Sequence, residues 1–194
     1  MQLSSRALEN AFVRLEPFED SHKEQLRPAL DHDADAWNGM VSAAHGEHFD
    51  SWWNAAVTAR DGGSRIPYVV RRVPDGDIVG TTSLYEIKPE HRRCEIGPTF
   101  YRPDVRGTKV NPAAKLLLLQ HAFDAGAIRV EIITDANNAA SQAAIRKLGA
   151  TFEGILRQHK RTWTGRMRDT VQFAILADEE WPAVKAGLVA RLAA

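Results

Sequence analysis

The chain has 194 residues, and its 25 Lys and Arg residues balance its 25 Asp and Glu residues, so the formal net charge is zero. A hydrophobic content of 44% with 26% charged residues is typical of a globular protein that builds its own core. The neutral charge gives no general attraction to nucleic acid or to an anionic membrane, and no apolar run approaches the length of a membrane span.

Cysteine and histidine usage narrows the classes further. The one cysteine, Cys94, leaves no internal disulfide and no thiolate cluster for zinc, and the histidines lack the spacing of metal-binding motifs. The first residues lack the apolar stretch of a secretory leader, which together with the cysteine usage indicates a cytoplasmic protein. The length favours one domain, which we expect to span residues 1–194.

The first half of the chain is predicted to form an antiparallel meander preceded by helices. Two β-branched runs flank the turn at residues 74–77, whose sequence Pro-Asp-Gly-Asp predicts a hairpin. The expected elements are a strand at residues 12–15 ending near Pro17, a helix from Asp20 or Ser21 to about Leu30, a loop with helical turns at 31–48, an aromatic helix from Asp50 to Gly62, and strands at 68–73, 78–87 and 92–101.

The second half alternates helices and strands, which predicts a crossover packed on the sheet. Asn111 is the expected N-cap of a helix at 112–125, and Asn138 is the expected N-cap of a helix at 139–148; a glycine ends each of them. Further strands are expected at residues 128–134, 152–157 and 168–176, and Asp178 is expected to cap a final helix. The fold class is therefore α/β (or α+β), with a mixed sheet of about six or seven strands flanked by helices.

The loop from Arg106 to Asn111 contains Gly107 and enters the start of a predicted helix. Unpaired backbone N–H groups and the positive end of a helix dipole suit a phosphate or pyrophosphate, and Arg106 and Lys109 add positive charge. The spacing fits neither GxxxxGK[ST] nor GxGxxG, which argues against an ATP P-loop and a Rossmann site. The alternative interpretation is an ordinary loop with a good helix cap.

The strand before this loop is interrupted by Gly97 and Pro98. Proline cannot donate to a sheet ladder, so the pair indicates a bulge or an edge. If residues 128–134 form the neighbouring strand, pairing should fail beyond this point, and the two strands should splay and leave free backbone groups for a peptide-like ligand. The alternative is a strand that simply ends at Gly97.

Ser141 lies four residues before Ile145 and seven before Leu148, so it falls on the apolar stripe of its helix. A hydroxyl in that position needs a partner or serves a ligand. The alternative is a serine that hydrogen-bonds back to its own helix.

With these features in this order, the chain resembles GNAT-type N-acetyltransferases, and within them the RimJ/RimL-like branch of ribosomal-protein N-acetyltransferases. The resemblance runs from Phe12 to Leu176. Its main carriers are the Glu95-Ile96-Gly97 strand, the loop at residues 106–111, Asn137 with Ser141, and residues 144–149. The family loop has the pattern Q/R-x-x-G-x-G/A; Arg106 matches it, but Lys109 stands where glycine is usual and Asn111 where glycine or alanine is usual. This departure affects the geometry expected for the loop.

The resemblance implies acetyl transfer from acetyl-CoA to a primary amine, by direct attack in a ternary complex and without a metal. Ser141 is the implied proton donor to the leaving thiolate, and Glu95 is our candidate base, acting directly or through water. A salt bridge from Glu95 to Arg92 or Arg93 is the alternative interpretation of that residue. The implied cofactor-binding residues are Gly97, Thr99, Phe100, Arg106, Gly107, Thr108, Lys109, Val110, Asn111, Asn137, Ser141 and Lys147, and the expected acceptor-binding residues are Trp37, Trp52 and Glu95.

The acceptor remains open between a protein N-terminus, which needs an open groove, and a small-molecule amine, which needs a pocket walled by Trp37, Trp52 or Trp53. A non-catalytic acyl-CoA sensor on the same fold is an alternative, as is another donor such as succinyl-CoA. The expected partners are the amine acceptor and a possible second copy in a homodimer, with no nucleic acid and no membrane. The basic hairpin that a succinyl donor would use contains Arg157, His159, Lys160, Arg161, Arg166 and Arg168.

Overall fold

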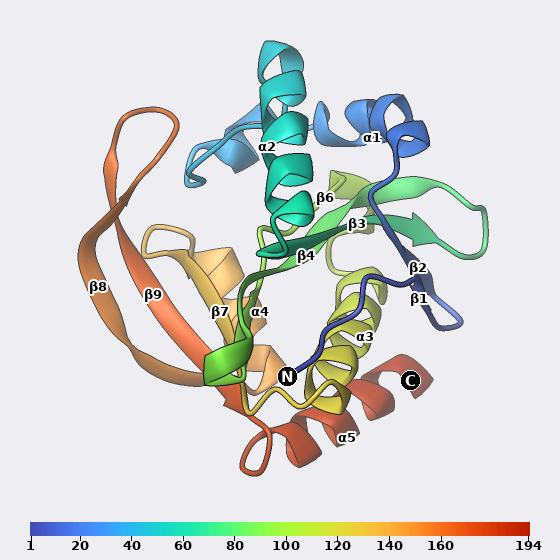
Figure 1. Cartoon of the computed structure of the whole chain (residues 1–194), viewed down its shortest axis with the longest axis vertical. Helices are drawn as coiled ribbons and strands as arrows, with labels where there is room; N and C mark the ends of the chain where they lie inside the picture. The colour runs from blue at the N-terminus through green and yellow to red at the C-terminus, as the bar shows by residue number, and fades with distance from the viewer.

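A computed structural model describes all residues from 1 to 194 and contains one nine-stranded mixed sheet with five α-helices packed around it (Figure 1). The strand order is β1-β2-β3-β4-β5-β7-β9-β8, and the short β6 pairs with β4 beside this path. The strands are β1 (Leu8–Glu9), β2 (Val13–Pro17), β3 (Arg65–Arg72), β4 (Ile78–Lys88), β5 (Arg93–Ile96), β6 (Phe100–Tyr101), β7 (Arg129–Asp135), β8 (Thr151–Arg161) and β9 (Met167–Leu176). The helices are α1 (Lys23–Leu30), α2 (Phe49–Asp61), α3 (Val110–Asp124), α4 (Ala139–Leu148) and α5 (Trp181–Ala193).

The mixed α/β class is confirmed, but the sheet has more strands than the six or seven expected from the sequence. The two-residue β1 is too short to show a period-two pattern, so nothing in its sequence announces it. The strand expected at 92–101 is two strands, β5 and β6, because Gly97 and Pro98 interrupt the pairing between them.

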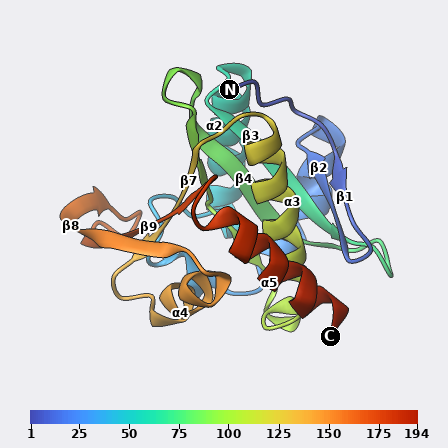
Figure 2. The same cartoon turned by 90° about the horizontal axis from the view of Figure 1, so that it is seen from below.

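The two faces of the sheet bury separate cores. The larger core, with 30 buried residues, lies between the sheet and the helices α3, α4 and α5, and includes Cys94 and Ile96 of β5. The smaller core, with 14 buried residues, lies under α1 and α2 and is dominated by aromatic rings. Figures 1 and 2 show α1 and α2 on one side of the sheet, opposite α3 and α5. Because side chains alternate along a strand, Glu95, between Cys94 and Ile96, faces the α1–α2 side.

The parallel pairing between β5 and β7 is short, as the sequence predicts. Residues 93–95 of β5 pair with residues 129–131 of β7, and the pairing stops there. β7 continues to Asp135 along β9, whereas the chain after β5 turns away and pairs with β4 as β6. The two strands therefore splay, and the edge of β7 beyond Glu131 has no strand partner on the β5 side.

Two helix starts differ from the expectation. α3 begins at Val110 rather than at Pro112; proline is tolerated there because no N–H in the first turn of a helix has an intrahelical acceptor. α5 begins after Glu180 rather than after Asp178, and the Glu180 carboxylate accepts a hydrogen bond from the Leu176 N–H at 2.8 Å. α4 begins after Asn138 and ends at Gly149, as predicted.

No helix combines the length and apolar character needed to cross a membrane. His, Cys, Asp and Glu side chains form no group of three or more that could hold a metal ion.

Candidate active site

Glu95 lies on β5 with 5% of its surface exposed, on the α1–α2 side of the sheet. Its direct cross-strand partner on β4 is Tyr85, whose hydroxyl donates a hydrogen bond to Glu95 Oε1. Burial raises the pKa of Glu95 to about 7, while the Tyr85 hydrogen bond and the charge of Lys160 act in the opposite direction. A carboxyl group with a pKa near neutrality is suited to accept a proton from an amine.

The alternative interpretation of Glu95, a salt bridge with Arg92 or Arg93, has no support in the geometry. Arg93 pairs with Glu131 at 2.9 Å, and Arg92 donates to the Gly126 carbonyl at 2.9 Å. Glu95 therefore carries no neutralising arginine, and its only side-chain hydrogen-bond partner is Tyr85.

The loop before α3 presents free backbone donors. The N–H groups of Gly107, Lys109 and Asn111 donate to no other group of the chain, whereas the Val110 N–H donates to the Thr108 hydroxyl at 3.3 Å. Gly107 has a φ of +78°, a conformation that glycine adopts without strain. These free donors at a helix start are the arrangement that binds a phosphate oxygen.

The two loop residues that depart from the family pattern do not close the loop. The Lys109 ammonium donates to the Leu192 carbonyl of α5 at 3.0 Å, so it is held on that helix. Arg106 forms an ion pair with Asp33. Asn111 Oδ1 is buried and has no hydrogen-bond partner. The backbone donors of the loop thus remain available despite the larger side chains.

The start of α4 presents Ser141 as the sequence analysis expects. Asn138 Oδ1 accepts the Ser141 backbone N–H at 2.9 Å, which satisfies the helix start. Ser141 is partly exposed, and its hydroxyl makes no hydrogen bond within the chain, so it does not bond back to its own helix. Asn137, just before α4, and Lys147, near its end, are both exposed. The Asn137 N–H donates to Asp135 Oδ1 at 3.0 Å.

The strand residues beyond the splay are less free than the sequence suggests. The Gly97 N–H donates to the Ser83 carbonyl at 3.0 Å, and Phe100 pairs with Thr81 of β4 and stacks on Trp37 with ring centroids 4.5 Å apart. Thr99 lies between β5 and β6, and its hydroxyl is 2.8 Å from the Thr82 hydroxyl. Of the three residues expected to meet the pantetheine, Thr99 has the least secondary-structure pairing.

Lys115 is a site-region residue that the sequence analysis missed. It lies on α3 with 8% of its surface exposed, and its ammonium donates to the Thr99 hydroxyl at 3.3 Å. Burial lowers the pKa of Lys115 to about 8. The available signal is a lone lysine in a helix that is apolar on most sides, a position where lysine is unusual.

Trp37, Trp52 and Trp53 form part of a packed aromatic cluster rather than an open wall. Their exposed fractions are 1%, 3% and 3%. Trp53 stacks on Phe18 at 4.3 Å between centroids, and Trp52 Nε1 is buried without a hydrogen-bond partner. Contact of Trp37 and Trp52 with an acceptor stays a prediction.

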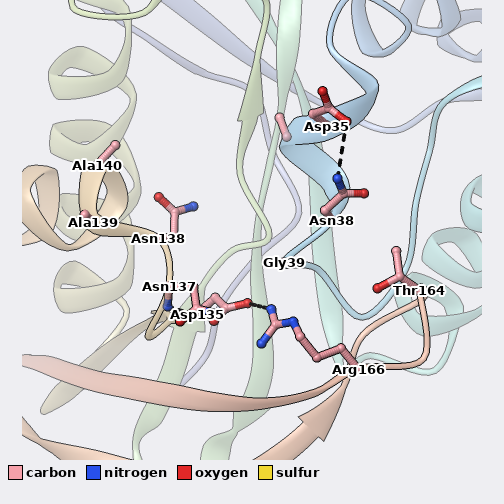
Figure 3. Close-up of a pocket in the computed structure, with 11 residues that line it drawn as sticks. Asp35, Asn38, Gly39, Asp135, Asn137, Asn138, Ala139, Ala140, Thr164 and Arg166 are labelled. Atoms are coloured by element: carbon pink, nitrogen blue, oxygen red, sulfur yellow. Dashed lines mark hydrogen bonds and ion pairs between the residues drawn. The ribbon is translucent and has the colours of Figure 1, made fainter.

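A cavity of about 680 Å³ lies beside the splay (Figure 3). Three segments line it, and their main contributors are Asp35, Asn38 and Gly39 before α2, Asp135, Asn137 and Asn138 between β7 and α4, and Thr164 and Arg166 at the tip of the β8–β9 hairpin. Arg166 forms an ion pair with Asp135 across the cavity floor. Gly39 lies so close to Asp135 that a Cβ at position 39 would be 3.0 Å from its Oδ2.

The tip of the β8–β9 hairpin is fastened to the chain segment at residues 37–40. The Trp163 N–H donates to the Met40 carbonyl at 3.1 Å, and the Trp163 indole donates to the Trp37 carbonyl at 3.0 Å. Arg168 Nη1 donates to the Gly39 carbonyl at 2.7 Å. These contacts close one side of the cavity; the sequence does not predict them, because they join segments that are far apart along the chain.

Comparison with known proteins places this geometry among acetyltransferases. Residues 13–151 match the family model of the acetyltransferase (GNAT) domain, and no curated protein is similar to the chain in sequence. An assigned acetyltransferase of T. thermophilus is 32% identical, with 99% of this chain and 100% of that chain covered and a TM-score of 0.88. A GCN5-related N-acetyltransferase of Brucella melitensis is 29% identical, with 96% and 85% covered and a TM-score of 0.87. Mycobacterium smegmatis RimJ in complex with CoA-disulfide shares the fold at 24% identity, with 95% and 92% covered and a TM-score of 0.76.

Proposed function

This chain belongs to the GNAT acetyltransferase family, and we propose that it is an acetyl-CoA-dependent N-acetyltransferase that acts on a primary amine by direct attack in a ternary complex. The observation that carries the proposal is the splay of β5 and β7, with free backbone donors at one end and the buried carboxyl of Glu95 at the other. All of residues 1–194 take part in the proposed domain.

The donor is proposed to lie across the splay. The pyrophosphate meets the free N–H groups of the loop at residues 106–111, where the start of α3 adds its positive dipole end. The two pantetheine amides meet the open edge of β7 and the chain around Thr99. The binding of CoA by M. smegmatis RimJ supports the choice of a CoA thioester as donor. Asn137, Ser141 and Lys147 flank the same path from α4.

The chemistry needs three groups from the chain. Glu95 removes a proton from the acceptor ammonium, directly or through water, and the free amine nitrogen then attacks the thioester carbonyl carbon. A backbone N–H at the splay holds the oxyanion. When the carbon–sulfur bond breaks, the CoA thiolate takes a proton from the Ser141 hydroxyl, which makes no hydrogen bond within the chain and is therefore free to donate.

The fastened hairpin favours a small amine over a protein N-terminus as acceptor. Trp163 ties the hairpin tip to residues 37–40 by two hydrogen bonds, so the cavity beside the splay is walled on that side. A protein N-terminus needs an open groove for the residues that follow its first amine, and the wall narrows that approach.

Mass spectrometry of amines and N-terminal peptides incubated with the protein and acetyl-CoA tests the proposal. We expect an acetyl mass gain on small amines, with release of free CoA thiol. Ser141→Ala is expected to lower turnover about 100-fold or more while the calorimetric affinity for CoA is unchanged. Tight binding of acetyl-CoA with no transfer to any amine would identify a non-catalytic sensor, and transfer only from succinyl-CoA would overturn the choice of donor.

A further inference from the structure

Unpaired positive charges surround Glu95 on the α1–α2 side of the sheet. Arg65 of β3 is the direct cross-strand partner of Tyr85, and Tyr85 is the direct partner of Glu95, so the three side chains share one face on adjacent strands. Arg168 of β9 and Lys160 of β8 are direct partners on the hairpin. The charge of Arg168 acts on Tyr85 and Glu95, and that of Lys160 acts on Glu95.

Arg65 has no carboxylate partner. Its Nε donates to the Ser83 hydroxyl at 2.9 Å, and its Nη2 is buried without any hydrogen-bond partner. The guanidinium carbon lies 5.9 Å from the centre of the Trp52 ring, so the side chain extends under α2 toward the site. Burial lowers the pKa of Arg65 to about 10, which still leaves it charged at neutral pH.

Arg168 is also free of an ion pair, although only 7% of its surface is exposed. Its Nη1 and Nε donate to the Gly39 carbonyl and the Thr170 hydroxyl, which are uncharged acceptors, and its Nη2 makes no hydrogen bond. The nearby carboxylate of Asp135 is engaged by Arg166. One face of the Arg168 guanidinium thus remains available for a ligand.

Buried guanidinium groups without a carboxylate are costly, and they strongly favour a ligand that supplies one. A simple ammonium acceptor, in contrast, would be repelled by these charges. Guanidinium groups match the planar geometry of a carboxylate with paired hydrogen bonds. We propose that the acceptor of this enzyme carries a carboxylate close to its reactive amine, and that Arg65 and Arg168 bind this carboxylate beside Glu95.

This inference rests on the proposed acetyl transfer and names the substrate class of that same site. The shared chemistry has two sources: the α-carboxylate of a free amino acid, or an acidic side chain near a peptide N-terminus. The experiment therefore compares amino acids with their C-terminal amides, and peptides with Asp or Glu at the second position with the corresponding Asn or Gln peptides.

We expect the wild-type protein to prefer carboxylate acceptors over their matched amides at least tenfold in kcat/KM, because hydrogen bonds to charged groups contribute about a factor of ten or more each. Arg65→Gln is expected to raise KM for the carboxylate acceptor about tenfold, with little change for the amide and none in KM for acetyl-CoA. Arg168→Lys, which keeps the charge but loses the planar fork, is expected to reduce the preference in the same direction. Arg157→Gln is the matched control, since Arg157 is exposed on the same hairpin and its side chain forms no hydrogen bond or ion pair.

Equal use of acids and amides, or a preference for amides and polyamines, would overturn the carboxylate proposal and leave acetyl transfer intact. Calorimetry with N-acetyl amino acids and their amides, in the presence of CoA, supplies a readout that does not need turnover; equal affinity for the two would also overturn it. Absence of both acetyl-CoA binding and transfer would instead contradict the proposed function.

Discussion

Glu95 combines deep burial with a single hydroxyl donor, and its ionisation sets the expected pH dependence of the reaction. The ionised carboxylate is the form that accepts a proton. Because burial raises the pKa of Glu95 to about 7, kcat/KM is expected to fall about tenfold per pH unit below pH 7 and to level off above it. Glu95→Gln is expected to lower kcat/KM by about 100- to 10,000-fold and to abolish this limb of the profile. An unchanged pH–rate profile in the variant would assign Glu95 a structural role.

Tyr85 is expected to act as a positioning residue through Glu95. Its hydroxyl donates to the carboxylate and therefore favours the ionised form, so Tyr85→Phe removes that support and raises the pKa of Glu95 further. The acid limb of kcat/KM is expected to move to higher pH by roughly one unit, since a hydrogen bond to a charged group contributes about 1.5 kcal/mol or more. Activity at pH 9 should stay close to that of the wild type. A variant that loses activity equally at every pH would show that Tyr85 does not act through the ionisation of Glu95.

At the scale of the element, the loop into α3 depends on one left-handed residue. A Cβ at Gly107 would meet no atom within 4 Å, so Gly107→Ala introduces only the strain of its φ of +78°. That strain, about 1–2 kcal/mol, is relieved by turning the neighbouring N–H groups away from the phosphate position. We expect acetyl-CoA affinity measured by calorimetry to fall about tenfold. Gly63→Ala is the matched control, with a φ of +73°, an equally open position and a place at the end of α2.

A comparable loss of stability in both variants, with donor affinity lost only in Gly107→Ala, would support the phosphate-binding role of the loop. Equal donor affinity in Gly107→Ala and the wild type would contradict it.

The elements differ in how well the sequence predicts them, and the reasons are physical. α4 carries local signals at both ends, an N-cap asparagine and a C-terminal glycine, and both are in place. The short pairing of β5 and β7 is also predicted, because Gly97 and Pro98 limit it locally. β1 and the ion pair between Asp135 and Arg166 depend on tertiary contacts that leave no periodic signal. The buried Lys115 escapes prediction because the apolar residues around it dominate the pattern of its helix.

For the whole molecule, the β8–β9 hairpin joins the C-terminal part of the sheet to the segment before α2, and Figure 1 shows the hairpin standing apart from the rest of the sheet. The Trp163 indole and backbone N–H groups hold this junction on the carbonyls of Trp37 and Met40. The catalytic face is thus assembled from both halves of the chain, with Glu95 and Tyr85 from the middle strands. This arrangement links acceptor binding to a junction far from the donor loop in sequence.

Trp163→Phe tests that link, because it removes the indole N–H while keeping an aromatic ring. The loss of one hydrogen bond is expected to cost about 1 kcal/mol and to lower the melting temperature by about 2–4 °C. Hydrogen exchange at the Trp163 amide, which donates to Met40, should become faster, and KM for the acceptor should rise severalfold while KM for acetyl-CoA is unchanged. Trp181→Phe is the control, since Trp181 packs against Phe123 on the opposite side of the sheet. Faster exchange without any change in KM for the acceptor would show that the hairpin junction stabilises the fold but does not form a wall of the acceptor site.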